Sequence, residues 1–203
     1  MSPQSIHQML DHQMHLWKIH RALLDERGEP DVLSRRPVVA LSRQLGSCHG
    51  EIARAVGARL DLQVHGRTLI DAVARDKGLE RRLVEALDER TRSESKVWVS
   101  GLLNRRLFSH DEFHLALAKV VRTLAARGGV LFVGRGAGWI LEGAERLHVR
   151  IVASPETRVA NLVRDEDLDE ALAWERIQRS DEERAAFVRR LFHADIDDPA
   201  AYD

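Results

Sequence analysis

The chain has 203 residues, of which 44% are hydrophobic and 31% charged, and its formal net charge is −1 at pH 7. This length fits one domain with a small appendage, and the composition is that of a soluble globular protein. A balanced charge gives no bulk attraction to nucleic acid or to an anionic membrane, so neither is expected as a partner.

The first predicted element is an amphipathic helix from Ser5 to about Arg27, because apolar residues recur at near-helical spacing until Gly28 and Pro30 end the pattern. Residues 1–36 are expected to form this helix and a linker, and residues 37–203 the main domain. The apolar face of the helix needs a cover. It can dock on its own domain or pair with a second copy of the chain as a homodimer. The N-terminal segment lacks a long uninterrupted apolar run, so neither a secretion signal nor a membrane span is expected.

Four short segments, the first of them a continuous apolar run, predict the strands of a sheet. They are Val38–Leu41, Leu62–His65, Val130–Val133 and Leu147–Val152. Helical patterns separate them, which indicates parallel βαβ units and a three-layer α/β fold. A helix is expected to start at Ser154, because serine can cap it and Pro155 can occupy its first turn.

The first of three notable strand-to-helix junctions follows the first apolar run. Ligands of open parallel sheets bind at the carboxyl ends of the strands, where helices begin. Here Gly46 and Gly50 stand between the strand and the next helical pattern. Backbone N–H groups in such a turn form a nest that suits phosphate. A tight turn without a ligand is the alternative interpretation of two glycines.

The second junction is Val133–Ala137, where Arg135 stands between two glycines. An arginine in this setting can present a planar guanidinium to a phosphate. The third candidate is the helical pattern from Arg176 onward, which contains Arg179 and Arg184 among acidic residues. By composition alone, a solvated helix face with internal salt bridges is the preferred interpretation of this third pattern.

Taken in order, these motifs resemble those of the cytidylate kinase-like family, a branch of the P-loop nucleoside monophosphate kinases. The resemblance runs from about Val38 to Asp203. The segments that carry it are Ser42-Arg43-Gln44, Gly46-Ser47, Glu51-Ile52-Ala53, Val133–Ala137, Val152–Val159, Arg179–Arg184, Asp198-Pro199 and Tyr202-Asp203. It implies a P-loop NTPase-like fold, in which helices flank a parallel sheet and a helical lid covers about residues 176–195.

The resemblance also implies transfer of the γ-phosphoryl group of ATP to CMP or a related small acceptor, with Mg²⁺ bridging the donor phosphates. Such a protein acts by positioning and charge neutralisation rather than through a covalent intermediate. The implied site residues are Arg43, Gly46, Ser47, Cys48, His49 and Gly50 in the donor loop, Arg135 for the acceptor phosphate, Arg158 as a further phosphate ligand, and Arg179 and Arg184 as catalytic lid arginines.

The loop departs from the ordinary P-loop, in which a lysine reaches the phosphates and the next hydroxyl binds Mg²⁺. Here His49 takes the lysine position and Gly50 the hydroxyl position, so no metal ligand is assigned in the chain. Histidine is shorter than lysine and largely neutral at pH 7. The alternative function is therefore a catalytically impaired nucleotide-binding or scaffold protein with a degenerate P-loop.

Cys48 stands in the same loop, where family members carry glycine, and it is the chain's single cysteine. An internal disulfide is therefore excluded, which suits a reducing cytoplasm, and a cytoplasmic location is expected. No acyl-transfer partners accompany Cys48, so a catalytic thiol is not expected.

Overall fold

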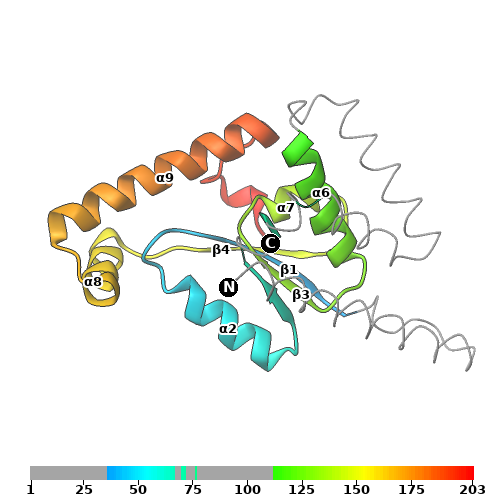
Figure 1. Ribbon diagram of the computed structural model, residues 1–203, viewed down its shortest axis with the longest axis horizontal. Helices are drawn as coiled ribbons and strands as arrows, with labels where there is room; N and C mark the ends of the chain where they lie inside the picture. The colour runs from blue at the N-terminus through cyan, green and yellow to red at the C-terminus, as the bar shows by residue number, and fades with distance from the viewer. Residues whose placement is uncertain (1–35, 67–69, 72–75, 77–111) are drawn as a thin grey trace, which may run out of the picture. The chain divides into compact units, whose positions relative to one another are not determined.

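The computed structural model describes residues 36–66, 70, 71, 76 and 112–203 (Figure 1). Their elements are β1 (Val38–Arg43), α2 (His49–Arg59), β2 (Gln63–His65), α6 (Glu112–Ala125), β3 (Val130–Val133), α7 (Ala137–Ile140), β4 (Leu147–Ile151), α8 (Pro155–Glu166), α9 (Glu170–Phe192) and the 3₁₀ helix η2 (Pro199–Ala201). The predicted N-terminal helix lies outside the described residues. Its separation from a domain over 37–203 therefore stays a prediction.

The four strands form one parallel sheet in the order β2-β3-β1-β4, with helices flanking it. β1 is an inner strand that pairs in parallel with β4, and Arg43 lies opposite Ile151. Its first five residues are buried, which explains the continuous apolar run Val38–Leu41. The predicted α/β fold with a parallel sheet is confirmed. β1 extends two residues beyond the predicted run, so Arg43 stands at the carboxyl end of a central strand.

The described residues fall into two compact units. In one of them, whose described residues are 36–38, 65, 66, 70, 71, 76 and 112–130, α6 buries the regularly spaced Leu117, Val120, Val121 and Leu124. The other comprises residues 39–64 and 131–203 and holds most of the sheet. None of the described helices has both the length and the apolar character needed to cross a membrane.

Two apolar clusters fix the helices of the second unit. The first packs β1, α2 and β3 together through Val39, Leu41, Ala53, Leu62 and Leu131. The second joins α8 to α9 through Val159, Leu162, Ala173 and Ile177. Burying one such side chain contributes roughly 1.5 to 3 kcal/mol. The first cluster therefore fixes α2 on the sheet, and the second fixes α8 on α9.

Both long C-terminal helices begin with side-chain caps. The hydroxyl of Ser154 accepts the N–H of Thr157 at 3.2 Å, which confirms the helix start predicted there. The carboxylate of Asp169 accepts the N–H of Leu172 at 2.8 Å and starts α9. The segment predicted as a lid lies largely within this one continuous helix, and Ile177 is among the residues that α9 buries.

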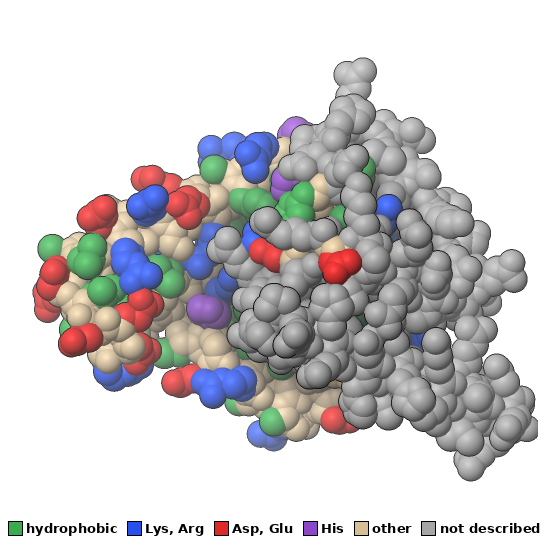
Figure 2. Space-filling view, viewed as in Figure 1, with side chains coloured by type: hydrophobic (Ala, Val, Ile, Leu, Met, Phe, Trp, Pro, Cys, Tyr) green, Lys and Arg blue, Asp and Glu red, His purple; other side chains and the backbone are tan. Residues whose placement is uncertain are grey.

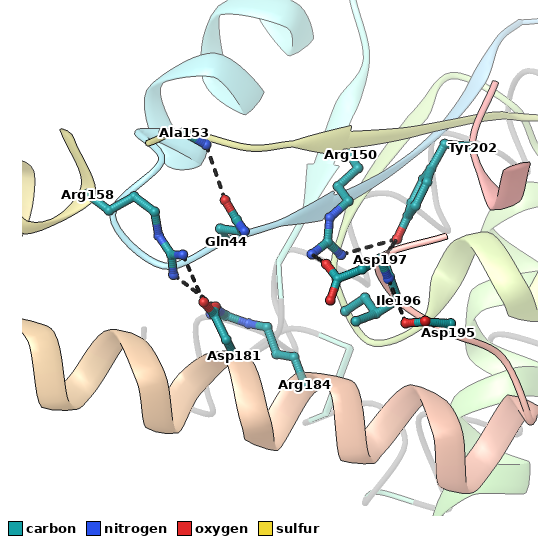
Figure 3. A network of polar contacts seen from close by, with 10 residues as sticks. All are labelled: Gln44, Arg150, Ala153, Arg158, Asp181, Arg184, Asp195, Ile196, Asp197 and Tyr202. Atoms are coloured by element: carbon teal, nitrogen blue, oxygen red, sulfur yellow. Dashed lines mark hydrogen bonds and ion pairs between the residues drawn. The ribbon is translucent and has the colours of Figure 1, made fainter. Parts of the chain in front are cut away.

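The residues after α9 return to β4. Asp203 accepts the backbone N–H of His148 at 2.7 Å, and its own N–H donates to the carbonyl of His148 at 2.9 Å. Arg150 donates to Asp197 at 2.5 Å and to the hydroxyl of Tyr202 at 3.3 Å (Figure 3). The guanidinium of Arg150 is therefore bonded to residues that follow α9.

Because His148 is buried, we expect the free energy of unfolding to fall at acidic pH. Its Nδ1 lies 2.9 Å from the carbonyl oxygen of Ala201, and burial, assisted by Arg146, lowers its pKa from 6.5 to about 4. The unfolded chain then binds more protons than the native protein between these pH values. Stability present above pH 6.5 is therefore lost as the pH falls toward 4, by about 1 to 2 kcal/mol at pH 5 for this group. Urea unfolding at pH 7 and pH 5 measures this loss, and His148→Asn should show a smaller one. An unchanged pH dependence in the variant would contradict this.

Candidate phosphate-binding site

The loop after β1 turns at Gly46 and enters α2 through Cys48. Both residues have left-handed backbones, with φ of 79° at Gly46 and 54° at Cys48. The hydroxyl of Ser47 donates to the carbonyl of Gln44 at 2.8 Å and closes the turn. A Cβ at Gly46 would lie 2.5 Å from the carbonyl oxygen of Arg158. The close approach of the α8 backbone therefore requires glycine at this point of the loop.

The backbone N–H groups at the start of α2 are the loop's anion-binding feature. The first N–H of this helix bonded to another backbone group is that of Glu51, which donates to the carbonyl of Cys48 at 3.1 Å. Among the described residues, no hydrogen bond engages the N–H groups of Cys48, His49 and Gly50. Free amides at the positive end of a helix dipole bind anions. Phosphate binding by this loop stays a prediction, with which these amides are compatible.

Arg43, the last residue of β1, lies against the second glycine motif. A Cβ at Gly134 would come within 1.8 Å of a terminal nitrogen of Arg43, and Gly134 has a φ of 81°. The N–H of Gly134 also donates to the carbonyl of Leu41 at 2.9 Å. Gly134 therefore positions an arginine that comes from the first junction.

Arg43 and Arg184 line one pocket at the carboxyl ends of β1 and β3, whose walls include Leu41, Trp139 and Phe187. One terminal nitrogen of Arg184, Nη1, is buried and makes no hydrogen bond to the described residues. Burial lowers the pKa of this guanidinium; Asp181 opposes the shift, and other arginines add to it. Arg184 itself is only partly buried and lies 3.9 Å from a carboxylate oxygen of Asp181, but a buried donor without a hydrogen bond is costly.

His49, the first residue of α2, lies close to both arginines. Burial, followed by the charges of Arg43 and Arg184, lowers its pKa to about 4, so the imidazole is neutral at pH 7. Its Nδ1 is buried and has no hydrogen-bond partner among the described residues. His49, at the start of α2, therefore lies near one arginine from β1 and one from α9.

Arg158, predicted as a phosphate ligand, bonds instead to the loop backbone and to Asp181 (Figure 3). It is buried, its Nε donates to the carbonyl of Leu45 at 2.6 Å, and its two terminal nitrogens donate to the carboxylate of Asp181 at 2.8 Å each. Asn161, also on α8, donates to the carbonyl of Gly46 at 2.7 Å. In this conformation Arg158 connects the loop to α9, and a direct contact with phosphate stays a prediction.

Comparison with known proteins agrees with this geometry. The model of the cytidylate kinase-like family matches residues 38–203. The chain belongs to the cytidylate kinase-like family. Membership implies the P-loop superfamily and indicates a nucleoside monophosphate kinase-like role. No curated protein matches the sequence significantly.

A solved structure supports the fold. The crystal structure of an uncharacterized protein from Eubacterium ventriosum ATCC 27560 superposes with a TM-score of 0.65. It is 19% identical in sequence, and the match covers 83% of this chain and 86% of that chain. At this identity the similarity shows the shared fold alone.

Two arginines predicted for the family's site are not brought to this pocket. Arg179 is exposed and pairs with Glu183 at 3.2 Å. It lies about 140° around the helix from Arg184, because they are five residues apart. Arg135, with a left-handed φ of 58°, is not among the residues that line the pocket of Arg43 and Arg184. The roles predicted for Arg179 and Arg135 stay predictions.

Arg179 lies on the outer, solvent-exposed surface formed by α8 and α9. Figure 2 shows basic and acidic side chains interspersed over this end of the molecule. Arg176 pairs there with Glu166, as Arg179 does with Glu183. This part of the arginine-rich pattern is thus the solvated, salt-bridged face that composition favoured. Two residues that the sequence did not single out as site residues make contacts here: Asp181 accepts from Arg158, and Asn161 donates to the carbonyl of Gly46.

The described residues do not fit a resident metal ion. No group of three His, Cys, Asp or Glu side chains is placed among them to hold one. Gly50 has no side chain, and the hydroxyl of Ser47 is donated to Gln44. Asp181 is bound to Arg158. A Mg²⁺ ion here would have to be held by the phosphates of the nucleotide that brings it.

Proposed function

We propose that this chain transfers the γ-phosphoryl group of ATP to CMP or a related small acceptor. The observation that carries the proposal is that Arg43 and Arg184 line one pocket and both lie close enough to His49, the first residue of α2, to lower its pKa. Guanidinium groups and the positive end of a helix both attract anions. A nucleotide triphosphate is such an anion, and its oxygens accept from both arginines and amides. Family membership supports the same chemistry.

In the proposed reaction this chain works by positioning and by charge. The amides of Cys48, His49 and Gly50 hold the donor phosphates. Arg43, seated on Gly134, and Arg184, presented by α9, stabilise the charge of the transferring group. Mg²⁺ bound to ATP would neutralise part of the phosphate charge.

The neutral His49 supports a second function, a protein that binds a nucleotide without efficient transfer. In the ordinary P-loop a lysine at this position contributes a full positive charge. The low pKa of His49 removes that charge at pH 7. A protein of this kind would bind ATP by its loop amides and two arginines, and would release ADP at the background rate.

An ADP-release assay with CMP, dCMP and UMP as acceptors, beside calorimetry of ATP binding, separates the two functions. Arg43→Met is expected to lower the turnover by roughly 10- to 100-fold, because it removes a contact with the transferring group. The control Arg59→Met, at the exposed end of α2, should keep the wild-type rate. ATP binding without turnover would contradict the kinase and support the second function. Absence of ATP binding would contradict both.

A further inference from the structure

The carboxylate of Asp181 lies between Arg158 and Arg184, and it bonds to the first more closely than to the second (Figure 3). The terminal nitrogens of Arg158 donate to its two carboxylate oxygens at 2.8 Å each. Nη1 of Arg184 lies 3.9 Å from one of these oxygens and makes no hydrogen bond to the described residues. The planar fork of Arg158 thus holds the carboxylate, while Arg184 has only a long-range ion pair with it.

This division depends on Arg158 rather than on the helix that carries the other two residues. Asp181 and Arg184 stand three residues apart on α9, a spacing at which such side chains pair directly. Arg158 comes from α8, is buried, and is fixed by its bond to the carbonyl of Leu45. Without Arg158, the carboxylate of Asp181 would have Arg184 as its nearest cation.

We propose that Arg158 is a positioning residue that keeps Arg184 available for phosphate by occupying the carboxylate of Asp181. The inference rests on the proposed function, since it assigns Arg184 to the nucleotide's phosphates. The same guanidinium holds the loop through Leu45, so one side chain fixes both the donor loop and the arginine opposite it.

Two other roles for Arg158 make different predictions about a double variant. If Arg158 binds phosphate directly, its loss weakens anion binding whether or not Asp181 keeps its charge. If it only supports the fold, removing Asp181 as well cannot restore binding. If it keeps Asp181 away from Arg184, neutralising Asp181 removes the competitor and restores binding.

The test measures binding of inorganic tripolyphosphate by calorimetry at pH 7 and low salt. Arg158→Met, which keeps the buried stem, is expected to weaken binding about 10-fold, as Asp181 turns to Arg184. Asp181→Asn should bind at least as tightly as the wild type. The double variant Arg158→Met/Asp181→Asn should return to within about 3-fold of the wild type. A double variant as weak as Arg158→Met would overturn the inference.

Controls separate this inference from folding and from the proposed function. Circular dichroism and thermal unfolding establish that each variant is folded. If Arg158→Met does not fold, the same cycle is run with Arg158→Lys, whose single ammonium cannot hold both carboxylate oxygens. Arg59→Met, exposed in the last turn of α2, should bind like the wild type. A wild-type protein that fails to bind tripolyphosphate would overturn the proposed function itself, whereas wild-type binding without recovery in the double variant overturns only the role of Arg158.

Discussion

Arg184→Met is expected to lower the rate of phosphoryl transfer by roughly 100- to 1,000-fold with little change in the fold. The guanidinium lines the pocket beside Arg43, and its Nη1 is buried without a hydrogen bond to the described residues. A donor held in this way costs no reorganisation when charge develops on the transferring group. Methionine keeps the apolar stem that packs in the pocket, so the loss falls on the charge.

The control for this prediction is Arg179→Met on the same helix. Arg179 is exposed and its salt bridge to Glu183 lies at the surface, so we expect a rate within about 2-fold of the wild type. An ADP-release assay with saturating ATP and acceptor compares the two variants. Equal losses in both would show that α9 moves Arg179 into the site during the reaction and would contradict an assignment based on Arg184 alone.

The sequence contained the information that separates these two arginines. The buried residues Ile177, Val188 and Leu191 recur with the helical period, and Asp181 and Arg184 fall in phase with them. Arg179 falls outside this stripe. The prediction grouped both arginines because it relied on the family motif, which gives the order of residues but not the phase of the helix.

The junctions were predictable because their causes are local. A buried strand followed by glycine places a loop at the sheet's carboxyl edge, and the Ser154 cap with Pro155 starts α8 where expected. The role of Arg158 was not predictable in this way. Its partner Asp181 is 23 residues away on another helix, and only the packing of α8 on α9 brings the two together. No spacing rule connects them.

The contact between Arg43 and Gly134 was also not predictable from local sequence. Each glycine motif predicts a turn on its own, since φ above zero favours glycine. That the glycine of one turn accommodates the arginine of the other follows from the neighbouring positions of β1 and β3 in the sheet. The family motifs thus mark two loops that lie against each other, which the sequence order alone does not show.

Gly46→Ala is expected to destabilise the protein by roughly 2 to 5 kcal/mol and to abolish tripolyphosphate binding. Two penalties add at this position. The backbone is left-handed, with a φ of 79°, and a Cβ would lie 2.5 Å from the carbonyl oxygen of Arg158. That oxygen belongs to the backbone of α8 and cannot turn aside as a flexible side chain can. The loop must therefore move, and the amides behind Gly46 move with it.

Two other glycines separate these penalties. Gly143 has a φ of 77° but open space around its Cβ, so Gly143→Ala should lose only the strain of about 1 to 2 kcal/mol. Gly50 has neither the left-handed backbone nor a neighbour within 4 Å, and Gly50→Ala should leave the stability unchanged or slightly raised, since alanine favours the first turn of α2. Urea unfolding ranks the three variants. If Gly46→Ala lost no more stability than Gly143→Ala, the contact between the loop and α8 would not constrain the site, and the loop would owe its shape to the turn alone.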